Sequence, residues 1–280
     1  MAGLITRFAP SPTGPLHLGH AFSALTAYDL ARSQNGQFLL RIEDIDTPRC
    51  RPAFEAQIYD DLHWLGLDWP LPVMRQSERR AAYASALAQL NALGVTYGCT
   101  CTRGDIRAAL SAPQEGTAPT GPDGPIYPGT CRHQQRDPEG AAIRLNMARA
   151  TALIGSVTFV ETGPLHTGSH IYTPEWLTTH VGDVVLARRD IGTSYHLAVS
   201  VDDAAQDISL VVRGVDLFEA TAIHTVLQRL LDLPTPEYHH HRLIRDTQGK
   251  RLAKRDAARA LSLYRDDGLT PEALRESLAL

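Results

Sequence analysis

Residues 4–20 read LITRFAPSPTGPLHLGH, and the interpretation of the whole chain starts from this stretch. Its apolar beginning stops abruptly at a loop rich in proline and glycine, which predicts a β-strand entering a rigid turn. The spacing that follows predicts a helix whose first turn carries His17, Gly19 and His20. A helix N-terminus presents unpaired backbone N–H groups and favours phosphate, although two histidines there could also be capping residues or half of a metal site.

Beyond this stretch, strand-like and helix-like patterns alternate. Four apolar runs predict strands, and five segments with helical spacing predict helices. This alternation is typical of a parallel α/β sheet. The predicted strands are 4–8, 38–42, 183–188 and 208–213, and the predicted helices are 18–33, 52–65, 79–93, 195–203 and 218–231.

The alternation is interrupted between about residues 99 and 165. Prolines and glycines crowd residues 111–130, which excludes regular structure there, and short strand patterns follow at 142–145 and 157–161. We interpret this region as an insertion domain. The predicted division is 1–98 for the first half of the main domain, 99–165 for the insertion, 166–235 for the second half, and 236–280 for a C-terminal segment.

Length and charge set broad limits. The 280 residues suffice for about two domains, or for one large domain with an insertion. The net charge is −4, yet basic residues gather between Arg242 and Arg259, and charge alone would make this segment a solvated surface. No run approaches the roughly 18 apolar residues of a membrane helix. Arg7 and three prolines lie where a secretory signal peptide would need its apolar region, so we expect no signal peptide and a cytoplasmic protein.

Four motifs in the same order resemble class I aminoacyl-tRNA synthetases of the glutamyl and glutaminyl branch. Residues 10–20 resemble the HIGH signature, and RIEDIDT at 41–47 resembles a second segment of that branch. The motifs YHLA, VDD and VRGVDL within 195–217 resemble its glutamate-binding stretch, and RLAKR at 251–255 stands where the KMSKS loop belongs. The resemblance implies a Rossmann-like catalytic domain with an insertion and a short helical C-terminal end.

The resemblance implies a glutamate site. Arg7 and Arg213 are expected to pair with substrate carboxylates, because a guanidinium group binds a carboxylate through two parallel hydrogen bonds. Glu43 is expected to hold the substrate ammonium group, Tyr195 to orient it, and Ser11 to add a hydrogen bond. The alternative for each charged residue is an ordinary surface ion pair.

The resemblance also implies an ATP site. His17, Gly19 and His20 are expected to contact phosphate, together with Arg251 and Lys254 of the KMSKS-like loop. We expect Mg²⁺ to enter with ATP. The residues expected to be catalytic are His17, His20 and Lys254, which would stabilise charge on the phosphates.

Two positions depart from the family pattern. Val199 stands where glutamyl-tRNA synthetases often carry asparagine, which predicts weaker or differently posed glutamate binding. Ala253 replaces the usual serine of the KMSKS loop, while Arg251 keeps the charge of the usual lysine. Because charge on a mobile loop is the catalytic contribution, we expect activity to survive.

Three cysteines cluster in the insertion. Cys99, Cys101 and Cys131 offer three thiolates, a favourable start for a tetrahedral zinc site, although three packed reduced cysteines are the alternative. The spacing resembles the zinc knot of a truncated glutamyl-synthetase paralogue, which implies Tyr127 as the fourth ligand, with His133 as a competitor. The zinc is expected to be structural; Cys50 stands apart from this group.

We expect no anticodon-binding domain, because the chain ends about 25 residues after the KMSKS-like loop. This architecture resembles truncated paralogues that activate L-glutamate with ATP and attach it to queuosine in the anticodon loop of tRNA(Asp). Two alternatives remain: a minimal glutamyl-tRNA synthetase that charges a tRNA 3′ end, and a non-catalytic RNA-binding paralogue. We expect a monomer with no membrane partner.

Overall fold

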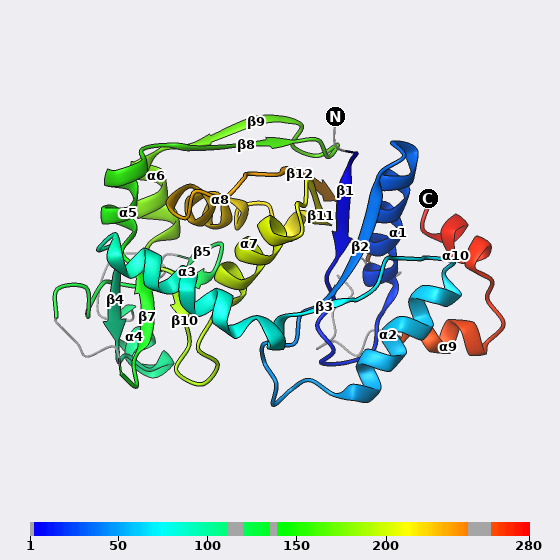
Figure 1. Ribbon diagram of the computed structural model, residues 1–280, viewed down its shortest axis with the longest axis horizontal. Helices are drawn as coiled ribbons and strands as arrows, with labels where there is room; N and C mark the ends of the chain where they lie inside the picture. The colour runs from blue at the N-terminus through cyan, green and yellow to red at the C-terminus, as the bar shows by residue number, and fades with distance from the viewer. Residues whose placement is uncertain (1–2, 111–119, 135–138, 246–258) are drawn as a thin grey trace.

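The computed structural model describes residues 3–110, 120–134, 139–245 and 259–280, and its elements are arranged as in Figure 1. Within these ranges, no helix combines the length and the apolar character needed to cross a membrane. The KMSKS-like loop, with Arg251, Ala253 and Lys254, lies outside the described residues.

The N-terminal part is a parallel three-stranded sheet in the order β1-β2-β3. Strand β1 (Ile5–Phe8) leads through the proline-rich loop into helix α1 (Leu18–Ser33), and β2 (Gln37–Ile42) returns beside β1. Helix α2 (Pro52–Trp64) then connects β2 to the short strand β3 (Met74–Arg75). Small side chains on α1 let this helix pack closely against the sheet; its buried residues are Ala21, Phe22, Ala24, Leu25, Ala27 and Ala31.

A second sheet has four strands in the order β11-β12-β8-β9. Strand β11 (Leu210–Gly214) runs parallel to β12 (Glu237–His241), which pairs in parallel with β8 (Val157–Glu161). Strand β9 (Gly168–Tyr172) closes this sheet as an antiparallel neighbour of β8.

The two sheets meet where β11 runs beside β1, as Figure 1 shows near the centre of the molecule. The Ser209 backbone N–H donates to the Ile5 carbonyl at 3.0 Å, and Arg7 Nη1 donates to the Val212 carbonyl at 3.3 Å. The carboxyl ends of β1, β2 and β11 therefore lie along one edge, which is where open α/β sheets form their ligand crevice.

A separate small antiparallel sheet lies at the other end of the molecule, in the order β10-β7-β4. It comprises β4 (Thr96–Cys99), β7 (Ala142–Leu145) and β10 (Val185–Ala187). A hairpin of β5 (Thr120–Gly121) and β6 (Gly124–Pro125) accompanies it. The expectation that residues 111–130 contain no regular structure is therefore wrong at this hairpin, because glycine and proline are compatible with two-residue strands joined by a tight turn.

The remaining described elements connect or cover these sheets. They are η1 (Gln76–Arg79), α3 (Arg80–Ala92), α4 (Arg103–Leu110), α5 (Met147–Ile154), α6 (Pro174–Trp176), the π-helical η2 (Leu177–Val181), α7 (Tyr195–Ala205), η3 (Val215–Leu217), α8 (Thr221–Leu230), α9 (Leu261–Asp266) and α10 (Pro271–Ser277).

The sheets do not follow the predicted domain limits. Strand β8 lies within the predicted insertion, yet it pairs with β12 of the larger sheet through Tyr238 and Glu161. Strand β10 was expected to resume the main sheet, but it pairs with β7 through Val185 and Arg144, so this expectation is wrong. A strand's own sequence does not specify its partner, which explains the exchange. The four domain ranges themselves stay a prediction.

Several elements had no sequence prediction, among them β4, α4, α5, β9 and β12. Strand β12 reads EYHHH, and its histidines hide the alternation of apolar and polar residues that marks a half-buried strand. In the structure both His240 and His241 are buried: His240 lies between Arg213 and Glu161, and the ring of His241 packs against Phe22.

Candidate active site and metal centre

A cavity of about 370 Å³ opens at the edge where β1, β2 and β11 end. Its walls come from segments far apart in the sequence, including the start of α1 and the first residue of α7. Its size suits a small polar ligand. It brings together seven predicted site residues: Arg7, His17, Gly19, His20, Glu43, Tyr195 and Arg213.

The two histidines of the first motif cap helix α1 reciprocally. His17 Nδ1 accepts from the Gly19 backbone N–H at 3.1 Å, and His20 Nδ1 accepts from the His17 backbone N–H at 3.1 Å. Their ring centroids are only 3.8 Å apart. Because Nδ1 of each ring accepts, the proton of each neutral ring lies on Nε2, which is therefore a donor. His17 and His20 therefore cap the helix and line the cavity at the same time.

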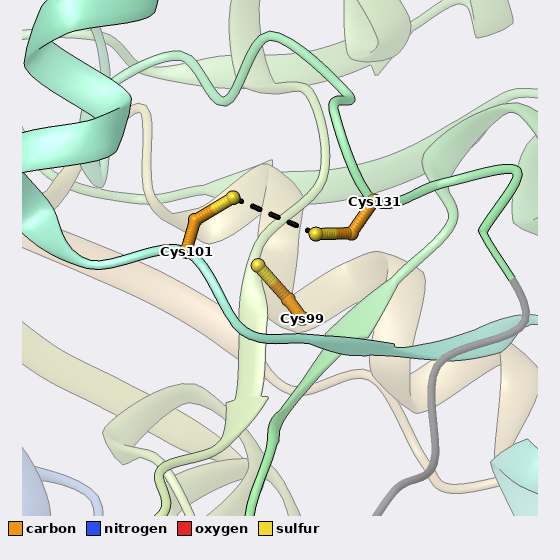
Figure 2. Close-up of side chains that lie close together, drawn as sticks. All are labelled: Cys99, Cys101 and Cys131. Atoms are coloured by element: carbon orange, nitrogen blue, oxygen red, sulfur yellow. Dashed lines mark hydrogen bonds between the residues drawn. The ribbon is translucent and has the colours of Figure 1, made fainter.

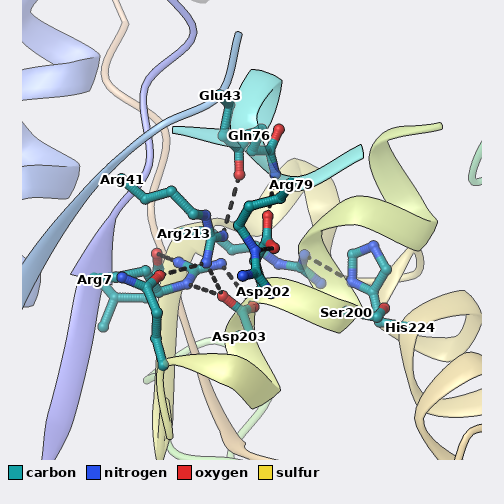
Figure 3. Close-up of polar contacts among 12 residues, drawn as sticks. Arg7, Arg41, Glu43, Gln76, Arg79, Ser200, Asp202, Asp203, Arg213 and His224 are labelled. Atoms are coloured by element: carbon teal, nitrogen blue, oxygen red, sulfur yellow. Dashed lines mark hydrogen bonds and ion pairs between the residues drawn. The ribbon is translucent and has the colours of Figure 1, made fainter. Parts of the chain in front are cut away.

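Asp203 on α7 is the counter-ion that two buried arginines share (Figure 3). Arg7 donates from Nε and Nη2 to its two oxygens at 2.9 and 3.3 Å, and Arg41 donates from Nη1 at 2.7 Å. Burial would raise the pKa of Asp203, but the two guanidinium groups hold it below its usual range. The Nε and Nη2 groups of Arg7, which could otherwise bind a substrate carboxylate through two hydrogen bonds, are therefore paired with a carboxylate of the protein itself.

Glu43 lies next to this cluster and lines the same cavity. Arg41 Nη2 donates to its Oε1 at 3.2 Å. Burial raises the pKa of the Glu43 carboxyl, against the opposing effect of Arg41. A cationic group entering the cavity would favour the ionised form of this carboxylate.

Arg213 is held differently, by neutral groups. Its Nη1 donates to His224 Nδ1 at 3.0 Å and its Nε to His240 Nε2 at 3.1 Å. Its Nη2 donates to Thr221 Oγ1 at 2.8 Å and to the Leu217 carbonyl at 3.3 Å. Among the described residues, Arg213 forms no ion pair with a carboxylate, which distinguishes it from Arg7.

A second, larger cavity of about 1090 Å³ adjoins the first, because Glu43, Tyr195 and Leu217 line both. Ser11 lines the second cavity rather than the first. Arginines are frequent on its walls, and they come from the loop after β2, from α4, from β7 and from the segment after β10. They are Arg49, Arg103, Arg107, Arg144, Arg188 and Arg189.

The three cysteines of the insertion converge as predicted from their clustering (Figure 2). The sulfurs of Cys99, Cys101 and Cys131 lie within 4.8 Å of one another, and those of Cys101 and Cys131 are 3.5 Å apart. The Tyr127 hydroxyl is 3.4 Å from the sulfurs of both Cys99 and Cys101. His133 is described but does not belong to the sulfur cluster, so the geometry favours Tyr127 as the fourth group.

This donor set fits zinc. Zinc–sulfur bonds of about 2.3 Å in a tetrahedron separate the sulfurs by about 3.8 Å, close to the spacing of Cys101 and Cys131. Burial would raise the pKa of the Cys131 thiol, but hydrogen bonds from Tyr127, the Thr100 backbone and the other cysteines lower it to about 6. The thiolate is the form of cysteine that binds metal, so a lowered pKa favours metal binding.

The departure from the family pattern at Val199 lies outside both cavities. Val199 is buried and lines neither cavity, so its apolar side chain does not remove a polar group from their walls. Sequence reasoning missed Asp203, His224 and His240 as neighbours of the arginines. Asp203 belongs to a quoted motif, but nothing local links it to Arg7, which is 196 positions away.

Comparisons with known proteins identify the family of this chain. The family model of class I tRNA synthetases (E and Q), catalytic domain, matches residues 3–280. The glutamyl-Q tRNA(Asp) synthetase of Rhodobacter capsulatus is 59% identical over 282 residues, covering 99% of this chain and 100% of that protein. The protein of the same name from Geobacter sulfurreducens is 43% identical, over 94% of this chain and 79% of its own length.

Solved structures are similar as well. A glutamate-tRNA synthetase from Elizabethkingia anophelis superposes with a TM-score of 0.71 at 30% identity, over 91% of this chain. This chain spans about half of that protein, because the match covers 53% of its length. The methionyl-tRNA synthetase of Mycobacterium tuberculosis, in complex with methionyl-adenylate, has a TM-score of 0.66 at 10% identity, which shows a shared fold.

Proposed function

The chain belongs to the family of class I tRNA synthetases for glutamate and glutamine (E and Q), and from that premise we propose its substrates. The chain is a ligase that activates L-glutamate with ATP to form glutamyl-adenylate, and transfers the glutamyl group to queuosine in the anticodon loop of tRNA(Asp). Its likeness to the Rhodobacter capsulatus protein, over the whole length of both, supports this acceptor. The observation that carries the proposal is the convergence of Arg213, Glu43 and the two capping histidines on one cavity.

Glutamate would bind with its side-chain carboxylate toward Arg213. A buried guanidinium with neutral neighbours favours an anionic partner, since charge-assisted hydrogen bonds are the stronger ones. Glu43, with Tyr195 beside it, would hold the ammonium group. Arg7 would contribute a hydrogen bond from its Nη1 group, which also donates to the Val212 carbonyl, because Asp203 pairs with the other side of its guanidinium.

ATP would bind with its phosphates at the N-terminus of α1. The donors there are the Nε2–H groups of His17 and His20, which suit phosphate oxygens, because the Nδ1 atoms of the two rings already accept the backbone N–H groups of Gly19 and His17. Mg²⁺ would enter on the phosphates of ATP and neutralise part of their charge. Lys254, from the KMSKS-like motif, would neutralise the departing pyrophosphate. The α-carboxylate of glutamate attacks the α-phosphorus, and the bond to the pyrophosphate oxygen breaks.

The acceptor RNA would approach through the second cavity. Arg103 and Arg107 stand one helical turn apart on α4, and Arg189, in the segment after β10, donates to the carbonyls of Thr100 and Cys101 just before that helix. Among the described residues, none of the three forms an ion pair with a carboxylate, so all can contact phosphate. A hydroxyl of queuosine would then attack the carbonyl carbon of the adenylate, releasing AMP.

The zinc site would be structural. Cys99, Cys101, Tyr127 and Cys131 would bind the ion and tie the hairpin β5–β6 to β4. Because four protein ligands close the tetrahedron, the ion would have no open position for a substrate. Cys101 and Tyr127 line the second cavity, whereas the capping histidines line the first, which is consistent with a role in folding rather than in adenylate formation.

Two assays test the proposed function. Transfer of labelled glutamate to tRNA(Asp) should require queuosine, so tRNA that lacks the modified base should remain unlabelled. Labelling of a tRNA 3′ end, removable by a 3′ exonuclease, would instead show a minimal glutamyl-tRNA synthetase. Exchange of pyrophosphate into ATP with glutamate should be robust; its absence would favour a non-catalytic RNA-binding protein.

A further inference from the structure

Two series of hydrogen bonds start at Arg213 and continue through histidines beyond the first cavity. We propose that His224 and His240 are positioning residues that present Arg213 to the substrate as an unneutralised cation, and so make the site select glutamate over glutamine. This inference rests on the proposed function and adds a residue-level basis for its specificity.

The hydrogen-bond directions follow from the chemistry of arginine, whose N–H groups can only donate. His224 Nδ1 and His240 Nε2 must therefore accept, at 3.0 and 3.1 Å, and neither atom carries a proton. Each neutral ring then carries its proton on the other nitrogen. His224 Nε2 donates to His196 Nδ1 at 3.0 Å, and His240 Nδ1 donates to Glu161 Oε2 at 2.5 Å.

The series of hydrogen bonds ends at a carboxylate on each side of Arg213. Each group in the series therefore donates in the direction away from Arg213. Glu161 is fully buried and also accepts backbone N–H groups of Gly163 and His240. At the other end, His196 Nε2 lies 3.2 Å from Asp123, on the turn of the β5–β6 hairpin. Arg213 is thereby fixed by groups anchored in the larger sheet and in the insertion.

Both histidines resist protonation. Burial lowers the pKa of His224 well below its usual value, and the adjacent Arg213 lowers it further. Burial likewise lowers the pKa of His240, against the opposing effect of Glu161. A protonated imidazole could not accept from the guanidinium, so the observed hydrogen bonds require both rings to stay neutral.

The arrangement leaves Arg213 with charge and with a donor to spare. His224 takes one of the two Nη1 hydrogens, while Thr221 and Leu217 take those of Nη2. Within the described part of the chain, the second Nη1 hydrogen has no partner, and Arg213 lines the first cavity. A carboxylate would pair with this buried cation, whereas the neutral amide of glutamine would leave it unneutralised.

The test compares His224→Leu, which removes the acceptor, with His224→Gln, which keeps one. Pyrophosphate exchange is measured with glutamate and with glutamine, and the KM for ATP is determined in parallel. For His224→Leu we expect the KM for glutamate to rise about tenfold or more and the preference for glutamate over glutamine to fall, with KM for ATP unchanged. His224→Gln should restore most of the preference.

Further variants separate positioning from general damage. His240→Leu should act like His224→Leu, while His239→Leu, on the same strand but with its ring at Thr162, should leave the preference unchanged. If His224→Leu misfolds, His240→Leu carries the test, with the binding of glutamate and of glutamine measured by calorimetry. An unaltered preference for glutamate over glutamine in whichever of His224→Leu and His240→Leu folds would overturn this inference. The proposed function would then still stand. A wild-type chain that does not activate glutamate would overturn the proposed function.

Discussion

The replacement Asp203→Asn tests the electrostatic basis of the site most directly. Asp203 accepts three hydrogen bonds from two buried guanidinium groups, from Arg7 at 2.9 and 3.3 Å and from Arg41 at 2.7 Å. Asparagine has the same shape but no charge, and its amide group would face donors. Glu43 would remain as a carboxylate bonded to Arg41, and within the described ranges it makes no hydrogen bond to Arg7.

The magnitude follows from this geometry. Breaking a buried ion pair by removing one partner costs about 3–5 kcal/mol, because an uncompensated charge stays buried. For a chain of this size, that corresponds to a drop in Tm of about 6–12 °C. The low pKa of Asp203 adds a pH dependence: its contribution is complete above the unfolded pKa near 3.8 and is lost as the pH falls further. The variant should therefore lose its deficit in acid.

The assay is urea unfolding at pH 7.5 and at the lowest pH where both proteins stay folded. The control is Asp190→Asn, which removes an exposed ion pair with Arg188 at 2.7 Å and should change the free energy of unfolding by less than about 1 kcal/mol. A loss for Asp203→Asn no larger than that of the control would refute the reasoning. It would mean that water, rather than Asp203, compensates the two arginines.

Three further predictions concern metal, catalysis and acidity. The purified chain should contain one zinc ion by elemental analysis. Cys131→Ser should lower the zinc occupancy and also the Tm measured by thermal unfolding, and a wild-type chain without zinc that is as stable as the variant would contradict this. Lys254→Ala should lower the rate constant of adenylate formation by roughly 10²–10³-fold with little change in ATP affinity, measured before the steady state; a defect confined to ATP binding would make Lys254 a binding residue only. Burial raises the pKa of Asp61 to about 6, against the attraction of Arg265. Since this raised pKa lowers stability as the pH rises from about 4 to above 6, Asp61→Asn should raise the Tm at pH 7.5 and give a smaller gain at pH 4.5.

Much of the local structure could be predicted because it depends on neighbours in the chain. The apolar run before the prolines became β1, and the alanine-rich segment became α1, over residues 5–8 and 18–33. The clustering of three cysteines within about 30 residues also predicted their convergence. Strand β12 escaped prediction because EYHHH has no apolar alternation, and its burial depends on polar partners from β8 and β11.

The sequence by itself determined the order of the motifs, the family they resemble and the residue types available at the site. Only the tertiary structure decided which of those residues neutralise one another. Arg7 and Arg213 are equivalent as sequence predictions, yet Asp203 pairs with Arg7, while His224 and His240 hold Arg213 without neutralising it. The physical reason is that backbone conformation follows from adjacent residues, whereas a charge interacts with whatever packing brings within a few ångströms of it.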